Sequence, residues 1–135
     1  MNTKIGHLVY GIDPKNIPFY RDLFSFLGWK VMWETEHIIG VSGAGDTSLW
    51  LGQAVKNHVN DYDGPGLNHV GIHTDSVADV DATVAYLKTQ GIHGLFGTPR
   101  HHAEFSSDTT DYYQVMFESP DRLLIEVVYT GPLQK

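Results

Sequence analysis

The chain has no cysteine among its 135 residues, and it has no uninterrupted apolar run of about 18 residues. The first absence excludes disulfide bonds, thiolate catalysis and cysteine-bound zinc. The second predicts that no helix of the chain spans a membrane. The residues after Met1 carry no apolar core of the kind found in secretory signals, so we expect a cytoplasmic protein.

Basic residues are also scarce. Nine Lys and Arg stand against 16 Asp and Glu, which gives a formal net charge of −7. Because a nucleic-acid-binding protein normally needs a basic patch that neutralises phosphates, this scattered set of cations argues against that class. The rest of the composition, with 41% hydrophobic and 19% charged residues, is typical of one globular domain covering residues 1–135. Eight histidines point to metal or proton chemistry.

The most informative pattern is an internal repeat. The β-rich stretch Gly6–Asp13 returns as Asn68–Asp75, and the aligned His7 and His69 lie 62 positions apart (69 − 7). Each stretch precedes a segment with the apolar spacing of an amphipathic helix. The apolar positions of these two predicted helices are Tyr20, Leu23, Phe24 and Leu27 in the first, and Val77, Val80, Val84 and Leu87 in the second.

Three strand-like segments follow each predicted helix. They are Trp29–Glu34, His37–Ser42 and Ser48–Gln53 in the first half, and His93–Thr98, Tyr112–Glu118 and Leu123–Tyr129 in the second. Each half is therefore predicted to be a β-α-β-β-β module, over about residues 4–56 and about residues 66–131. A module of about 60 residues has little core of its own. We therefore expect an α+β fold, in which two modules related by a pseudo-twofold axis form a curved mixed sheet around a metal or substrate cavity.

The repeat gives His7 and His69 equivalent positions in two first strands. Glu126 lies in the last strand of the second half, inside the apolar run Leu123–Val128, where a carboxylate is costly unless it is paired or bound to a metal. Two imidazoles and one carboxylate suit a divalent Fe, Mn, Ni or Zn ion and leave coordination positions open. We therefore predict that His7, His69 and Glu126 form a metal site. Alternatively, both histidines are ordinary strand residues bonded to backbone carbonyls, and Glu126 is a solvated one.

Four segments carry a resemblance to a known family: Gly6–Tyr10 (GHLVY), Phe19–Trp29 (FYRDLFSFLGW), Leu67–Ile72 (LNHVGI) and Phe117–Glu126 (FESPDRLLIE). Together they resemble the vicinal oxygen chelate superfamily, which includes glyoxalase I, ring-cleaving dioxygenases, fosfomycin resistance proteins and bleomycin-binding proteins. The resemblance extends from Ile5 to Tyr129, and the helix motif and the F-x-(D/S)-P-D-x4-E ending are specific only in combination. It implies that the family's metal ligands are His7, His69 and Glu126 here.

The chain also departs from its relatives. Many family members have a fourth ligand where the repeat places Trp50, and glyoxalase I has a carboxylate there. Because an indole neither binds a metal nor moves a proton, we expect negligible glyoxalase I activity. Ring-cleaving dioxygenases have a tyrosine where Phe117 stands, which argues against extradiol cleavage. The fosfomycin enzymes share a strand like Ser48–Leu51, but the acidic loop 100–111 has only Arg100 as a cation, so a phosphonate substrate is not expected.

Four residues are further candidates for contact with a substrate. His73 lies two pleats along from His69 and should face the same side, either as a proton carrier or as a bystander at the cavity rim. Trp50 would offer a flat apolar wall, and Tyr113 and the loop residue His101 are also predicted to contact the substrate. The structural alternatives are packed core rings for Trp50 and Tyr113 and a solvated loop for His101.

These observations predict a metal-dependent lyase, isomerase, transferase or dioxygenase acting on a small organic substrate that binds through one or two oxygens. One alternative is a non-enzymatic small-molecule binder similar to bleomycin resistance proteins, which usually lack the metal triad. Another is a vestigial fold kept as a structural partner. Because members of the family often dimerise, we also expect a homodimer that buries about 1,200–2,000 Å² in total.

Overall fold

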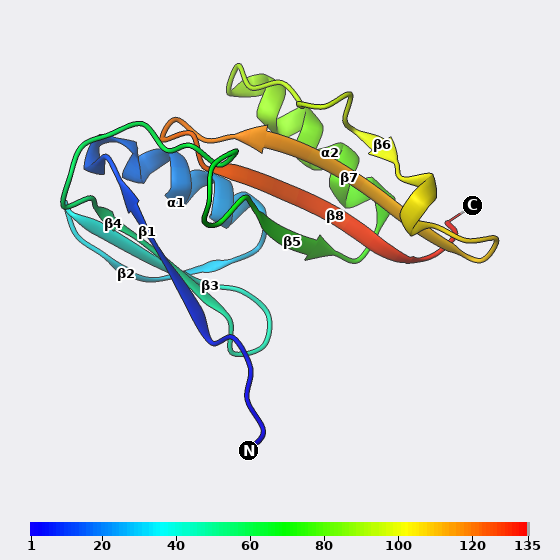
Figure 1. The fold of residues 1–135 in the computed structure, drawn as a ribbon, viewed down its shortest axis with the longest axis horizontal. Coiled ribbons are helices and arrows are strands. Elements are labelled where there is room, and N and C mark those ends of the chain that lie inside the picture. Colours follow the sequence, from blue (N-terminus) through cyan, green and yellow to red (C-terminus); the bar gives the residue numbers. More distant parts are fainter. Residues whose placement is uncertain (135) are drawn as a thin grey trace. The chain divides into compact units, whose positions relative to one another are not determined.

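The computed structural model describes residues 1–134, and the chain divides into two compact units, unit 1 (Met1–Val59) and unit 2 (Asn60–Lys135). Each unit contains one four-stranded mixed sheet and one α-helix (Figure 1). The predicted α+β class with two similar modules is confirmed. No helix within residues 1–134 is long and apolar enough to cross a membrane.

Unit 1 consists of β1 (His7–Ile12), the 3-10 turn η1 (Pro14–Asn16), α1 (Ile17–Phe26), β2 (Lys30–Glu34), β3 (Ile38–Ser42) and β4 (Ser48–Gln53). The strand order is β1-β4-β3-β2, with β1 parallel to β4 and the other pairs antiparallel. Asp13 caps η1 by accepting a hydrogen bond from the Lys15 amide at 3.1 Å. α1 packs against β2 and β3 through its buried residues Ile17, Tyr20, Leu23 and Phe24.

Unit 2 consists of β5 (Val70–Thr74), α2 (Val77–Thr89), β6 (Arg100–His101), the 3-10 turn η2 (Ala103–Phe105), β7 (Thr110–Glu118) and β8 (Leu124–Pro132). Its strand order is β5-β8-β7-β6, and again the first and last strands are parallel. Ser76 caps α2, because its Oγ accepts a hydrogen bond from the Asp79 amide at 3.1 Å and donates one to the Asp79 carboxylate at 2.7 Å. α2 packs against β5, β7 and β8.

The strand register makes the two units equivalent residue by residue. In unit 1, Val9 of β1 pairs with Trp50 of β4, and in unit 2, Gly71 of β5 pairs with Glu126 of β8. Val9 and Gly71 lie 62 positions apart (71 − 9), which is the offset of the sequence repeat. Trp50 therefore occupies in unit 1 the strand position that Glu126 occupies in unit 2, as the sequence repeat predicts.

The strand predicted at residues 93–98 is wrong, because this segment forms a turn ahead of β6. Phe96 has a φ of 56°, in the left-handed region that an extended strand excludes. Thr98 closes the turn, since its Oγ1 donates a hydrogen bond to the Leu95 carbonyl at 2.6 Å and accepts one from the Met116 amide at 2.9 Å. The turn is therefore tied to the neighbouring β7 strand through one buried threonine.

Candidate functional site

The candidate site is centred on His69 and Glu126 of unit 2. His69 immediately precedes β5, and Glu126 lies within β8, opposite Gly71. His69 Nε2 lies 3.0 Å from Glu126 Oε2. The Glu126 side chain is only 5% exposed, whereas that of His69 is 37% exposed. A carboxylate held inside the unit therefore meets an imidazole that solvent and small molecules can reach.

Asn68 determines which nitrogen of His69 carries the hydrogen. The Asn68 side-chain Nδ2 donates to the Tyr62 carbonyl at 2.9 Å, so Oδ1 is the acceptor that faces His69 Nδ1 at 2.7 Å. The hydrogen-bond network therefore assigns the hydrogen of His69 to Nδ1. The Nε2 lone pair then points at the carboxylate of Glu126. Because Nε2 and Oε2 are both electron-rich, their close approach is favourable when a metal cation or an extra proton on Nε2 lies between them.

Tyr112 of β7 holds the other oxygen of Glu126, because its hydroxyl donates to Oε1 at 2.5 Å. Burial, this hydrogen bond and the nearby Glu126 charge raise the pKa of Tyr112 to about 12, so the hydroxyl keeps its proton at neutral pH. Tyr112 is not among the site residues predicted from the sequence, which include its neighbour Tyr113. The register of the β7–β8 hairpin identifies it, because Tyr112 pairs with Thr130, two pleats along β8 from Glu126 and on the same face.

The loop that joins β6 to β7 packs on the ring of Tyr112. The Phe105 ring lies 5.2 Å from the Tyr112 ring and the His102 ring lies 5.8 Å from it, measured between centroids. Arg100 Nη2 in turn lies 3.0 Å from His102 Nε2. The loop therefore positions Tyr112, and through it the carboxylate of Glu126.

Tyr113 and His101 are together, but on the sheet face opposite to Glu126. Because side chains alternate along β7, Tyr113 points toward α2, where its hydroxyl donates to Asp81 Oδ1 at 2.7 Å. Burial, this hydrogen bond and the neighbouring carboxylates raise the pKa of Tyr113 to about 12. His101 Nδ1 lies 2.8 Å from Oδ1 of the buried Asp111, and its ring lies 4.5 Å from that of Tyr113. These two predicted substrate contacts form a cluster of their own.

His73 lies on the same face as Glu126, as its spacing from His69 predicts. It pairs with Val128, two residues beyond Glu126 on the parallel strand β8. Its Nδ1 lies 3.3 Å from Thr130 Oγ1. Its role as a proton carrier stays a prediction.

In unit 1, His7 begins β1 and pairs with Ser48, two positions before the pair formed by Val9 and Trp50 and on the same face of the sheet. The half-buried indole of Trp50 covers Gly40 of β3 so closely that a Cβ at Gly40 would come within 2.5 Å of a ring carbon. Trp50 Nε1 donates to Ser48 Oγ at 3.2 Å. Trp50 therefore supplies an apolar surface at this position and no metal-binding lone pair.

Over residues 1–134, neither unit by itself gathers three or more histidine or acidic side chains around one point. Unit 2 brings together two of the three predicted ligands, His69 and Glu126, while His7 belongs to unit 1. The pair fits a divalent cation in its chemistry, because an imidazole lone pair and a buried carboxylate oxygen face each other. Each group also has a hydrogen-bonding partner behind it, Asn68 and Tyr112 respectively, as metal ligands commonly do.

Comparisons with known proteins agree with this architecture. A family model described as the glyoxalase/bleomycin resistance protein/dioxygenase superfamily matches residues 4–127. A comparison with curated proteins gave no match.

Solved structures with a similar fold include a glyoxalase-family protein from Bacillus halodurans, which is 23% identical over 93% of this chain and 94% of that chain, with a TM-score of 0.76. A glyoxalase/bleomycin resistance protein from Albidiferax ferrireducens T118 is 14% identical, with 93% and 98% covered and a TM-score of 0.72. A lactoylglutathione lyase from Agrobacterium tumefaciens is 20% identical, with 95% and 94% covered and a TM-score of 0.64. At these identities the likeness establishes the fold.

Proposed function

This chain belongs to the glyoxalase/bleomycin resistance protein/dioxygenase superfamily, and we propose that it is a metal-dependent enzyme that binds a small organic substrate through oxygen atoms beside His69 and Glu126. One observation carries the proposal. His69 Nε2 lies 3.0 Å from the buried carboxylate of Glu126, while the Nδ1 hydrogen of the same ring is bonded to Asn68.

The roles of the residues follow from their hydrogen bonds. His69 Nε2 and Glu126 Oε2 would hold a divalent Fe, Mn, Ni or Zn ion, and His7 is the third ligand that the sequence repeat predicts. When bound, such an ion polarises a substrate oxygen. Asn68 keeps the His69 lone pair on Nε2, and Tyr112 occupies Oε1 of Glu126, so that Oε2 is the oxygen left for the ion.

Trp50 supports a reaction other than that of glyoxalase I. It stands at the unit 1 position equivalent to Glu126, where the family's isomerases use a carboxylate as a base, and its Nε1 hydrogen is bonded to Ser48. An indole accepts no substrate proton at this position. We expect negligible isomerisation of the methylglyoxal–glutathione hemithioacetal, and rapid turnover of that compound would contradict the role given to Trp50.

The metal site is tested by elemental analysis of the purified protein and by calorimetric titration of the metal-free protein with Zn²⁺ and Mn²⁺. We expect one ion per chain, and loss of that stoichiometric binding in His69→Ala and in Glu126→Gln. The matched control is His37→Ala, since His37 is an exposed histidine outside the site and should leave binding unchanged. If neither ion binds, or if all four proteins bind alike, His69 and Glu126 form an ordinary salt bridge and the proposal is wrong.

The alternative is a small-molecule binding protein without catalysis, and the half-buried indole of Trp50 supports it by offering a flat ring for stacking. Absence of bound metal, combined with quenching of tryptophan fluorescence by an aromatic ligand, would favour this reading. Trp50→Ala should then abolish that ligand's binding, while the same change in Trp33, which lies on β2, should not.

A further inference from the structure

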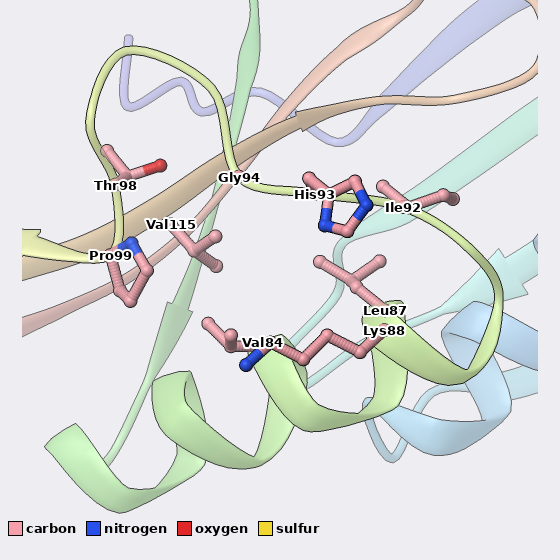
Figure 2. A pocket seen from close by; sticks show the side chains of 9 residues that line it. All are labelled: Val84, Leu87, Lys88, Ile92, His93, Gly94, Thr98, Pro99 and Val115. Carbon is pink, nitrogen blue, oxygen red and sulfur yellow. The ribbon is translucent and has the colours of Figure 1, made fainter.

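A cavity lies in unit 2, between α2 and β7, on the sheet face opposite to Glu126. Its volume is about 320 Å³, which is within the range of small-molecule sites. Figure 2 shows the apolar side chains that converge on it from the helix, the strand and the turn before β6. These apolar lining residues are Val84, Leu87, Ile92, Pro99 and Val115.

The walls of this cavity are fixed by hydrogen bonds. On one side, the Tyr113 hydroxyl donates to Asp81 and ties β7 to α2, next to Val115 of the cavity lining. On the other side, Thr98 joins its own turn to β7 through the Leu95 carbonyl and the Met116 amide. A cavity bounded by such cross-links is largely formed before a ligand arrives, so little conformational entropy is lost on binding.

One cation, Lys88, borders the cavity. Figure 2 shows its side chain extending beside Val84, and Lys88 is one of the residues that line the cavity. Within residues 1–134, no carboxylate forms a salt bridge with Lys88. Asp81, a carboxylate of α2 that is not part of the lining, accepts a hydrogen bond from Tyr113. His93 is the other titratable group of the lining.

We propose that this cavity binds a small amphipathic carboxylate, whose apolar chain lies between α2 and β7 and whose carboxylate pairs with Lys88. A chain of about eight carbons matches a pocket of this volume. The site is distinct from that of His69 and Glu126, because the two lie on opposite faces of the same sheet. Its occupation is also independent of the metal chemistry proposed above.

The test is a titration of the whole protein with octanoate, followed by amide chemical shifts and calorimetry. We expect a dissociation constant on the order of 1 mM, as is usual for a ligand of about ten heavy atoms. The shifts should concentrate at Val84, Lys88 and Val115 and leave Gly71 and Glu126 unchanged. Uncharged 1-octanol should bind more weakly to the unmodified protein than octanoate does.

Two variants decide the matter. Lys88→Met keeps the aliphatic stem and should weaken octanoate about tenfold while leaving 1-octanol binding unchanged, whereas Lys56→Met, at an exposed lysine of unit 1, should alter neither. Val84→Phe should fill the cavity and abolish octanoate binding at an unchanged melting temperature. If Val84→Phe fails to fold, the Lys88→Met comparison still decides. Equal octanoate affinity in Lys88→Met, or shifts centred on Gly71 and Glu126, would overturn the proposal.

Discussion

The orientation of a single amide, that of Asn68, governs the character of the candidate site. Its Nδ2 is bonded to the Tyr62 carbonyl, so it presents an oxygen to His69 and holds the imidazole hydrogen on Nδ1. Without that acceptor, the ring could carry its hydrogen on Nε2 and donate it to Glu126, which would turn a pair of metal ligands into a neutral hydrogen bond.

Asn68→Ala should therefore weaken the binding of Zn²⁺ or Mn²⁺ by about 10–100-fold, the usual effect of removing a hydrogen-bonding partner from a metal ligand. Titration calorimetry of the metal-free variant measures the change. The control is Asn60→Ala, because Asn60 lies in the same segment between β4 and β5 and its side chain donates to the Arg122 carbonyl at 3.0 Å. Equal loss in both variants would show that this segment as a whole, and not the His69 tautomer, sets the affinity.

The sequence indicated His69 through the repeat and Glu126 through the apolar run around it, and the structure places the two side chains 3.0 Å apart, while their role as metal ligands stays a prediction. The sequence was not sufficient to choose between Tyr112 and Tyr113. That choice depends on which face of β7 each residue occupies, and the face is set by the register of the β7–β8 hairpin. A shift of one residue in that register would exchange their roles, and no local pattern in the chain fixes it.

At the scale of elements, β7 carries two neighbouring tyrosines whose side chains lie on opposite faces of the sheet. Tyr112 supports the carboxylate of Glu126, and Tyr113 joins the strand to α2 through Asp81. The strand thus connects the candidate metal site on one face with the cavity on the other.

The hydrogen bond between Tyr113 and Asp81 should make the free energy of unfolding depend on pH in the alkaline range. Folding raises the pKa of Tyr113 from its usual 10 to about 12, so the folded protein binds the hydroxyl proton of Tyr113 more tightly than the unfolded chain does. The resulting stabilisation is complete below pH 10 and is lost as the pH rises through about 12.

We expect Tyr113→Phe to lower the free energy of unfolding by about 1 kcal/mol at neutral pH, the usual contribution of one hydrogen bond. The difference from the unmodified protein should shrink as the pH rises from 10 towards 12. Urea unfolding at a series of pH values measures it. A difference that grows over this range would mean that the ionised tyrosine is the favoured form.

Element boundaries were predicted closely except between α2 and β7. The segment 93–98 has enough apolar residues to resemble a strand, but its conformation is set by the left-handed Phe96 and by the bonds of Thr98 to β7. Those bonds join residues that are distant in the sequence, so periodicity within the segment carried no information about them.

At the scale of the whole molecule, we expect a homodimer, as the family resemblance implies. Unit 1 supports this through Val9 and Trp33, which are 67% and 59% exposed, since large apolar side chains on a surface often mark contacts with another chain. Light scattering at micromolar concentration should give 30.2 kDa (2 × 15.1). Trp33→Lys should shift the mass towards 15.1 kDa, while the control Phe96→Lys, at a 61% exposed position of unit 2, should not. A mass of 15.1 kDa for the unmodified protein would contradict the predicted homodimer.

The equivalence of the two units shows where along the chain their lengths differ. The offset between them is 62 at β1 and β5 (71 − 9), 63 at the ends of the helices (89 − 26), and 76 at β4 and β8 (126 − 50). Nearly all of this 14-residue difference in length (76 − 62) therefore lies after α2. This stretch contributes both the turn that walls the cavity and the loop that packs on Tyr112. The two units thus share one strand order but differ in length mainly at a single stretch, and the equivalent positions of their last strands hold an indole in unit 1 and a carboxylate in unit 2.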